Sequence, residues 1–179
     1  MARRTGAGGG EAGGRPAAGA TPATAALDAA GVPYALHRYP HDPAAASFGL
    51  EAAEALGVDP ARVFKTLLVS TGGGLAVGLV PVARSLGLKA MAAALGVKKV
   101  EMADPAAAER RTGYVVGGIS PLGQRHRSPS VIDASARDHG TVFVSGGRRG
   151  LEIELAPDAL AQTVGASFAD LATGGGRRS

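Results

Sequence analysis

Two apolar runs separated by a glycine turn constrain the fold of this chain more than any other feature. The first run, VFKTLLVS, covers residues 63–70, and the second, LAVGLVPV, covers 75–82. Each run has the length of a β-strand, and the intervening TGGG supplies the residues that tight turns favour. The pattern therefore predicts an antiparallel β-hairpin in the middle of the chain.

Helix and strand signals alternate at short spacing on both sides of this hairpin. Capping residues and terminating glycines predict helices over 22–30, 48–56, 85–95, 104–111 and 158–164, and a helical end over SFADLA at 167–172. Strands are predicted over 34–39, 114–119, 130–133, 141–145 and 151–155, the last two forming a second hairpin through GGRRG. Hairpins mixed with helices favour an α+β domain, compact and single, with a curved, mostly antiparallel mixed sheet flanked by helices.

The two ends of the chain differ in composition from the part between them. Residues 1–20 consist almost entirely of glycine, alanine and arginine, and residues 173–179 read TGGGRRS. Such segments lack the apolar side chains that offset the entropy of ordering, so we predict two disordered tails around a folded domain at 21–172. Glycines stand where a secretory signal needs an apolar stretch, and no run approaches the roughly 18 apolar residues of a membrane span.

The 179 residues include no cysteine, which excludes several classes of chemistry. A disulfide framework, a thiolate nucleophile, an iron-sulfur cluster and a sulfur-bound zinc site all require thiolates. His37 and His41 are four residues apart, but Pro40 and the strand-like context deny them a shared helical face, and all four histidines read as surface or turn residues. We expect no metal site and no cofactor.

The positive charge is confined to particular segments. The formal net charge is +4, of which each tail carries +2, so residues 21–172 are neutral. Within that neutral part, residues 84–127 carry eight basic and three acidic side chains. This stretch is the predicted location of phosphate contacts, should the protein bind nucleic acid.

Lys65 interrupts an otherwise apolar strand, and a buried lysine must be paired or functional. Strand alternation places Phe64 and Thr66 on one face and Lys65 and Leu67 on the other, so the amine can enter a cleft. A lysine that protects an exposed sheet edge is the equally weighted alternative.

Two glycine-rich segments are further candidates for a ligand site. GGISPLG at 117–123 and SGGRRG at 145–150 place consecutive backbone N–H groups where they can hold a phosphate or a developing oxyanion. Neither segment is a Walker loop or a hydrolase nucleophile elbow. An ordinary turn explains the first pattern more simply, and a flexible hairpin loop remains an alternative for the second.

Taken together and in order, these motifs resemble YbaK-type aminoacyl-tRNA deacylases, a family related to the editing insertion domain of bacterial prolyl-tRNA synthetase. The resemblance rests on HRYPHDPAAASFG, VFKTLL, KKVEMADP, ERRTGYVVGGISPLGQ, SVIDAS, VSGGRRGLEIEL and ASFADLA, and covers 21–172. It implies a cytoplasmic enzyme that removes mischarged cysteine from tRNA(Pro), with attack by the substrate's own thiol. It also implies aminoacyl-tRNA as the partner, with prolyl-tRNA synthetase a candidate second partner.

The resemblance also implies a set of site residues. Lys65, Gly117 and Gly118 take the catalytic positions, and the substrate-binding positions fall on Tyr39, Phe48, Thr66, Ile119, Ser120, Ser145, Gly146, Gly147 and Glu152. This chain departs from the pattern in having Glu152 in place of an expected aspartate and Pro40 in place of an acidic residue. Two alternatives stay open: a tRNA-binding or synthetase-binding module without catalysis, and an enzyme that acts on another small amino acid or acyl ester.

Overall fold

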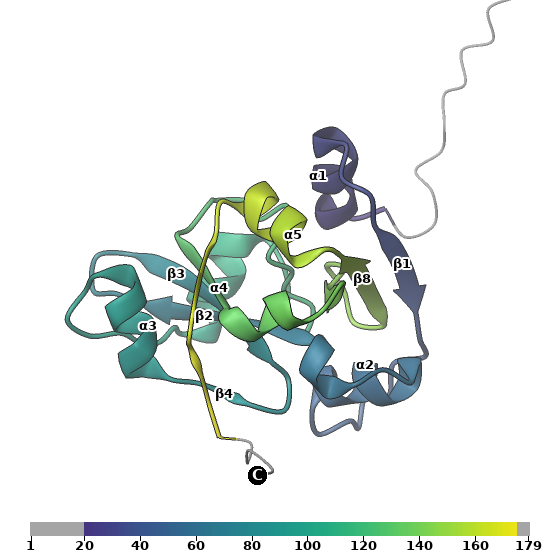
Figure 1. Cartoon of the computed structure of the whole chain (residues 1–179), viewed down its shortest axis with the longest axis horizontal. Coiled ribbons are helices and arrows are strands. Elements are labelled where there is room, and N and C mark those ends of the chain that lie inside the picture. The colour runs from purple at the N-terminus through teal and green to yellow at the C-terminus, as the bar shows by residue number, and fades with distance from the viewer. Residues whose placement is uncertain (1–19, 175–179) are drawn as a thin grey trace, which may run out of the picture.

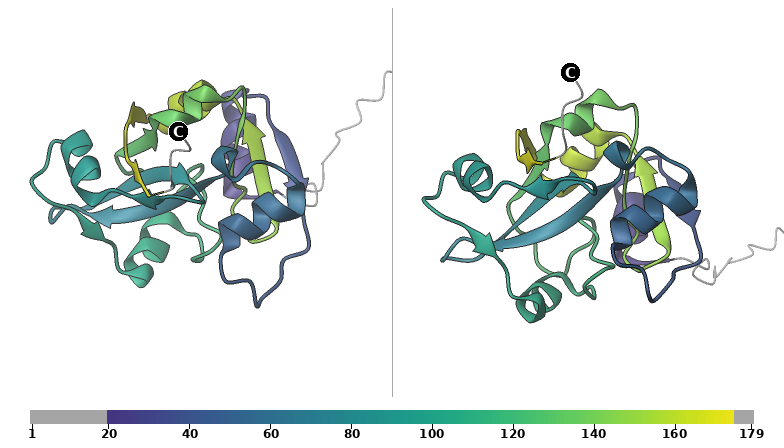
Figure 2. Two further views of the ribbon diagram at one scale, coloured as in Figure 1. Left: turned by 60° about the horizontal axis from the view of Figure 1, so that its bottom comes forward. Right: turned by 90° about the horizontal axis from the view of Figure 1, so that it is seen from below.

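The computed structural model describes residues 20–174 and contains two main sheets (Figures 1 and 2). The larger has the order β5-β2-β3-β6-β9, and the smaller has the order β1-β8-β7. Their strands are β1 (Ala35–Arg38), β2 (Phe64–Ser70), β3 (Leu75–Pro81), β5 (Glu101–Met102), β6 (Ser130–Asp133), β7 (Val142–Ser145), β8 (Leu151–Leu155) and β9 (Ser167–Ala169). A third pair joins β4 (Ser85–Leu86) to β10 (Ala172–Thr173).

Both predicted hairpins are confirmed. β2 pairs with β3 in the antiparallel register Phe64↔Pro81 to Ser70↔Leu75, and β7 pairs antiparallel with β8. Parallel pairing occurs only where β6 joins β3 and β9 among the described strands. The predicted α+β class is therefore correct, although the strands divide into three sheets instead of one.

A single β-bridge, Val63↔Phe143, connects the edge of the larger sheet to the smaller one. Figure 1 shows the smaller sheet with α1 at one end of the molecule and the β2–β3 hairpin with α3 at the other, and Figure 2 shows the same separation. The bridge therefore lies at a seam between two halves of the fold.

Five α-helices pack around these sheets within residues 20–174, and each ends at a glycine in the left-handed conformation. A side chain caps the N-terminus of three of them, and none caps the third or the fifth. The helices are α1 (Pro22–Ala30), α2 (Phe48–Leu56), α3 (Leu88–Leu95), α4 (Pro105–Thr112) and α5 (Pro157–Val164), and two short 3₁₀ turns occupy η1 (Pro60–Arg62) and η2 (Ala134–Asp138). Thr21 caps α1 through a reciprocal capping box with Thr24, and Gly31 ends the helix in the left-handed conformation. None of the helices within 20–174 is long and apolar enough to cross a membrane.

Alternation along β2 and β3 divides the apolar residues between two sides of the larger sheet. Phe64, Leu68 and Leu79 belong to the main core, which also contains side chains of α1, α4, α5 and the smaller sheet. Val69 and Val80 pack on the other side with Met91 of α3. The helices thus pack on both faces of the sheet, and the first part of β2, which β5 does not cover, is left with a free edge.

Two predicted elements are wrong. The segment 114–119 forms turns and not a strand, because Gly117 adopts φ 91° and the Tyr114 hydroxyl donates to the Leu122 carbonyl at 2.7 Å. The segment 167–172 contains β9 and the start of β10 in place of a helix, since β9 pairs with β6. The third predicted helix also begins later, at Leu88, because Ser85 and Leu86 pair with β10.

Asp133 fixes the end of the described chain. Its Oδ1 accepts the N–H groups of Leu171 and Ala172 at 2.8 and 2.9 Å, and its Oδ2 accepts the Ser135 hydroxyl at 2.5 Å. The residue is only 3% exposed. These bonds explain why an extended segment follows β9 where local sequence favours a helix.

The predicted domain boundaries are not tested by these observations. The predicted tails at 1–20 and 173–179 lie outside the described residues except for Ala20, Thr173 and Gly174, and Thr173 already belongs to β10.

Candidate active site

A cavity of about 420 Å³ opens beside β2, where the two main sheets meet. Four segments form its wall: α2 with the residues before it, β2, the region from β5 to the loop after α4, and the β7–β8 hairpin. Most lining side chains are apolar, and a few polar groups stand among them, which is typical of a small-molecule site.

The cavity brings together most of the predicted site residues. Those that line it are Tyr39, Phe48, Lys65, Thr66, Gly117, Ile119, Ser145 and Glu152. The ones that do not line it are Gly118, Ser120, Gly146 and Gly147. The lining residues come from five parts of the chain, namely the segment after β1, α2, β2, the loop after α4 and the β7–β8 hairpin, so the fold gathers what the sequence separates.

Lys65 lies on a part of β2 that has one free edge. On that side β2 pairs with β5 through Val69 and Ser70, and the Leu68 carbonyl accepts the Ala103 N–H at 3.0 Å. The next backbone link toward the start of β2 among the described residues is the bridge at Val63. Lys65 is half-buried, lines the cavity and forms no ion pair with a described residue. Burial lowers the pKa of its amine. The side chain is therefore both near an edge and inside a cleft.

Among the described residues, Glu152 is the only acidic one that lines the cavity. It is 8% exposed, and β8 places it opposite His37 of β1 and Ser145 of β7. Its Oε2 atom has no hydrogen-bond partner in the described part of the chain. Burial raises the pKa of this carboxyl to about 8, so the group holds a proton at neutral pH in the empty cavity.

Thr66 is the second cavity residue with an unpaired polar atom. Its Oγ1 is buried without a partner, and no other described residue besides these two has such a side-chain atom. Both atoms belong to residues that line the same cavity. Because buried polar groups in folded proteins are nearly always paired, two unpaired groups at one cavity make it the candidate ligand site.

Tyr39 provides a third polar group beside Glu152. Burial, and then the charge of Glu152, raise the pKa of its phenol to about 12. Its backbone N–H donates to the Gly150 carbonyl at 3.0 Å, which ties the residue to the β7–β8 turn. The phenol is therefore a neutral hydrogen-bonding group throughout the physiological pH range.

The loop after α4 explains why residue 117 is glycine. A Cβ at this position would lie 2.5 Å from Nε of Arg149, in addition to the positive φ of 91°. The Arg149 guanidinium carbon lies 4.2 Å from the ring centroid of Phe48, and its Nη2 donates to the Val116 carbonyl at 2.9 Å. Gly117 thus permits a close contact within the protein that joins the loop, α2 and the β7–β8 turn.

The residues outside the cavity wall make hydrogen bonds that hold the surrounding turns. The Gly118 N–H donates to the Val115 carbonyl at 2.9 Å, and the buried Ser120 accepts the Leu122 N–H at 3.2 Å. The Gly146 carbonyl accepts the Thr21 hydroxyl at 2.6 Å. The Gly147 N–H donates to Ser145 at 3.2 Å. An anion cradle built from the N–H of Gly118 or Gly147 would have to break these bonds, so the ligand roles assigned to these residues remain predictions.

Sequence reasoning did not assign Arg149, His41 or Glu51 to the site. His41 Nδ1 lies 3.1 Å from Glu51 Oε2, and the Asp42 N–H donates to Glu51 Oε1 at 2.6 Å. These contacts hold the segment before α2 against that helix, beside Phe48. In the sequence Arg149 stands out only as part of the basic pair Arg148 and Arg149, and no local signal indicates that it packs on an aromatic ring.

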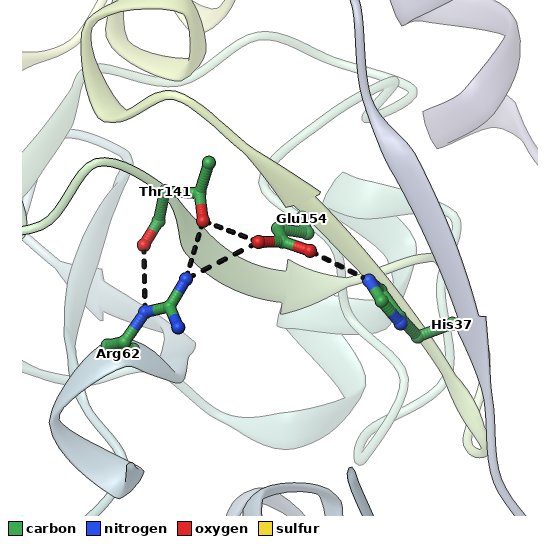
Figure 3. Close-up of polar contacts among 4 residues, drawn as sticks. All are labelled: His37, Arg62, Thr141 and Glu154. Atoms are coloured by element: carbon green, nitrogen blue, oxygen red, sulfur yellow. Dashed lines mark hydrogen bonds and ion pairs between the residues drawn. The ribbon is translucent and has the colours of Figure 1, made fainter. Parts of the chain in front are cut away.

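Two of the four histidines differ from the prediction in their surroundings. His37 lies on β1 and contacts Glu154 Oε1 at 2.9 Å (Figure 3). Glu154 Oε2 accepts from Thr141 Oγ1 at 2.5 Å and from Arg62 Nη2 at 3.3 Å. His37 and His41 are therefore both partly buried, and each contacts a carboxylate, so they are not bare surface or turn residues.

The basic stretch at 84–127 is partly used inside the protein. Arg84 donates to the carbonyls of Ala172 and Gly174, Arg111 to Ser128, and Arg127 to the Thr163 carbonyl. These guanidinium groups hold the backbone of other segments. They do not form one continuous set of unpaired charges facing solvent.

Residues 42–163 match the family described as the aminoacyl-tRNA editing domain, and the chain belongs to this family. A protein of Enterococcus faecalis (strain ATCC 700802 / V583), described as a candidate Cys-tRNA(Pro)/Cys-tRNA(Cys) deacylase, EbsC, is 40% identical over 122 residues, which is 68% of this chain and 74% of that protein.

Solved structures agree with this assignment. A crystal structure described as a candidate trans-editing enzyme for prolyl-tRNA synthetase is 25% identical, with a TM-score of 0.74 over 86% of this chain and 96% of the other. A crystal structure of hypothetical protein APE2540 is 27% identical, with a TM-score of 0.76 over 86% of this chain and all of the other.

Proposed function

We propose that the protein is a trans-editing deacylase that removes mischarged cysteine from tRNA(Pro). The observation that carries this proposal is the cavity at the seam, in which the unpaired polar atoms of Thr66 and Glu152 accompany a lysine. Membership of the editing-domain family and similarity to EbsC support the reaction and the substrate class. The cavity volume suits an aminoacyl group with part of its ribose.

The chemistry asks little of the protein beyond positioning and charge stabilisation. An aminoacyl ester is already activated, and the thiol of the bound cysteine can attack its own ester carbonyl. A sulfur–carbon bond forms while the ester carbon–oxygen bond breaks, and the thiol proton ends on the ribose hydroxyl that leaves. The products are free tRNA and a cyclic thioester of cysteine. A protein without cysteine can therefore carry out this reaction.

The roles of the residues follow from their charge and place. We assign Lys65 to the terminal phosphate or the ester oxygens, where an ammonium stabilises negative charge. Thr66 Oγ1 and the phenol of Tyr39 supply neutral hydrogen bonds, and Gly117 with Ile119 confines the aminoacyl group. A site that depends on the substrate thiol discriminates better than size alone, because one methylene is worth only about 1–3 kcal/mol in an apolar pocket.

A panel of aminoacyl-tRNAs tests the proposal directly. Purified protein is incubated with labelled Cys-tRNA(Pro), Ala-tRNA(Pro), Pro-tRNA(Pro) and Cys-tRNA(Cys), and loss of the label is followed. We expect fast loss from Cys-tRNA(Pro) and little from Pro-tRNA(Pro). Absence of turnover on every member would contradict the function, and hydrolysis of free amino-acid esters without tRNA would replace it with a different esterase activity.

Replacing the substrate thiol by a hydroxyl identifies the nucleophile. Ser-tRNA(Pro) should react far more slowly than Cys-tRNA(Pro), since a hydroxyl is the poorer nucleophile near neutral pH. Equal rates would indicate that water attacks the ester instead.

We further propose that the enzyme works in the cytoplasm on tRNA that prolyl-tRNA synthetase helps to present. Residues 21–172 carry no net charge, and several cations of the 84–127 stretch are bound to backbone carbonyls. Phosphate contacts of this part should therefore be few, giving weak tRNA binding with a shallow salt dependence. Titration at several salt concentrations, with and without the synthetase, checks this. Tight and steeply salt-dependent binding by the protein alone would contradict it.

A further inference from the structure

The cavity has an asymmetric charge distribution that no sequence motif reveals. Glu152 is its single acidic group and Lys65 its single basic one, and the two form no ion pair with each other. The Glu152 carboxyl is nine-tenths buried by β1, β7 and β8, and its Oε2 meets no donor among residues 20–174. The fold thus maintains an unpaired carboxyl oxygen inside an apolar wall, and this oxygen becomes an acceptor once the carboxyl gives up its proton.

The neighbours of Glu152 could have satisfied it but do not. His37, directly opposite in register, contacts Glu154 instead. The phenol of Tyr39 is close enough for the carboxyl to affect its pKa, but no hydrogen bond between them is present. Ser145, opposite on β7, accepts the Gly147 N–H. An acceptor left free by all three is available to a donor that arrives with the ligand.

The proposed substrate has one cationic group to offer. An aminoacyl ester carries a free α-amino group next to the scissile carbonyl, and the N-terminal type of amine titrates at about 7.7–8.0. The Glu152 carboxyl and this amine therefore have similar pKa values, so a proton can pass from the carboxyl to the amine. The resulting ammonium and carboxylate form one charge-assisted hydrogen bond, which pairs both groups.

We propose that Glu152 binds the α-ammonium group of the aminoacyl ester, so that the enzyme accepts esters with a free amine and rejects N-acylated ones. This inference rests on the proposed deacylase function and adds a chemical selection to it. An N-acylated amino acid, as in peptidyl-tRNA, brings no positive charge and would leave the carboxyl unpaired. Rejection of such substrates protects chains under synthesis, because a peptidyl-tRNA that ends in cysteine carries the same ester as Cys-tRNA and differs in its acylated amine.

The position is suited to selection by geometry as well as charge. A glutamate places its carboxyl one methylene further from β8 than the expected aspartate does. Glu152→Asp therefore withdraws the carboxylate while it keeps the charge, and Glu152→Gln keeps the length while it removes the charge. Glu154→Gln is the matched control, because Glu154 lies two residues away on the same face of β8 and outside the cavity wall.

Deacylation of Cys-tRNA(Pro) and N-acetyl-Cys-tRNA(Pro) by these variants tests the inference. The parent protein should prefer the free amine by at least about 100-fold, because a site built for a hydrogen-bonding group rejects its absence strongly. Glu152→Gln should slow Cys-tRNA(Pro) by about 30-fold or more and change N-acetyl-Cys-tRNA(Pro) by less than about 3-fold. Glu154→Gln should keep the parent ratio. Equal parent rates on both substrates, or equal losses on both in Glu152→Gln, would overturn the inference.

A stable analogue separates this inference from the deacylase proposal. The cysteinyl amide of 3′-amino-3′-deoxyadenosine cannot be hydrolysed at the ester position, and its binding is measured by calorimetry against its N-acetyl form. Tighter binding of the free amine that is lost in Glu152→Gln supports amine recognition even if no tRNA panel member is turned over. Equal binding of the two forms overturns amine recognition even if Cys-tRNA(Pro) is deacylated.

Discussion

Glu152 and Glu154 lie two residues apart on β8, and their surroundings differ completely. Glu154 is partly exposed and accepts from Thr141, Arg62 and His37 (Figure 3). Hydrogen bonding from Thr141 first, and then the contacts of His37 and Arg62, lower the pKa of Glu154 despite its partial burial. Glu152 is more deeply buried, has an unpaired oxygen, and has a raised pKa.

The comparison separates structural from functional carboxylates in this fold. The Glu154 contacts join β1, η1 and β8, so their free energy is already realised in the protein without a ligand. The Glu152 carboxyl costs free energy in the empty cavity and recovers it only when a ligand supplies a donor. Loss of a cavity group should therefore lower activity without lowering stability, whereas loss of a paired carboxylate should lower stability.

The largest expected effect is on activity. Lys65→Ala should slow deacylation of Cys-tRNA(Pro) by about 100-fold or more, because removal of one preorganised charge-stabilising group has that magnitude. The melting temperature should stay within a few degrees, since Lys65 makes no ion pair among the described residues. Single-turnover kinetics and thermal unfolding check both parts, with Arg137→Ala as the control at an exposed cation outside the 84–127 stretch. A folded Lys65→Ala protein with near-normal rates would refute the assignment.

The next effect concerns Asp133, which is as buried as Glu152 but fully paired. Asp133→Ala should lower the free energy of unfolding by about 3 kcal/mol, because it leaves the buried N–H of Leu171 without an acceptor and frees β10. Chemical denaturation measures the loss, and the deacylation rate at low temperature should be retained. A loss of unfolding free energy below about 0.5 kcal/mol would show that the hydrogen bonds of Asp133 contribute little to stability, and would contradict the comparison with Glu152.

Glu152→Gln should stabilise the protein in a pH-dependent way. The pKa of Glu152 is raised from its ordinary 4.5 to about 8, so the folded state holds a proton that the unfolded state releases between these values. Parent stability therefore falls as pH rises from about 4.5 to 8, and an uncharged amide removes this loss. We expect a gain on the order of 2 kcal/mol at pH 8 that shrinks towards pH 5. Denaturation curves that show a pH-independent gain would contradict this origin.

Glu154→Gln should show the opposite dependence and a smaller effect. The folded pKa of Glu154 is lowered, so its contribution is present above the unfolded value and disappears as pH falls through the folded one. At pH 7 we expect a loss of about 1 kcal/mol, because the group is partly exposed to solvent. The loss should vanish in acid. Unfolding is measured from pH 3 to pH 7. A loss that stays constant over this range would indicate a packing effect and would contradict the prediction.

Local signals predict the elements whose ends are capped and whose partners are adjacent. The box at Thr21 and the turn TGGG define α1 and the first hairpin without any distant contact. The errors fall at 114–119 and 167–172, where distant partners decide. Val115 and Val116 have strand-like side chains, yet both are exposed, and the loop is held by contacts to Arg149. In the second case pairing with β6 overrides local helix preference.

The candidate site also contains some residues that the sequence predicts and others that it does not. Lys65 can be found from the sequence because a charge in an apolar strand is a local anomaly. The state of Glu152 cannot be found there, because it depends on which groups β1 and β7 place beside it and on which of them are already paired. The contact of Arg149 with Phe48 joins residues about 100 positions apart, and no pattern in either segment predicts it.

The bridge between Val63 and Phe143 has a consequence for how the protein responds to its ligand. Thr66 belongs to one main sheet and Glu152 to the other, so a ligand bound to both acts as a clamp across the seam. By linkage, its binding free energy adds to the resistance of the two halves to separation. Amide hydrogens near the seam should then exchange more slowly when the cavity is filled, while those in the distant part of the β2–β3 hairpin keep their rates. Filling the pocket would therefore stabilise the contact between the two main sheets of the domain.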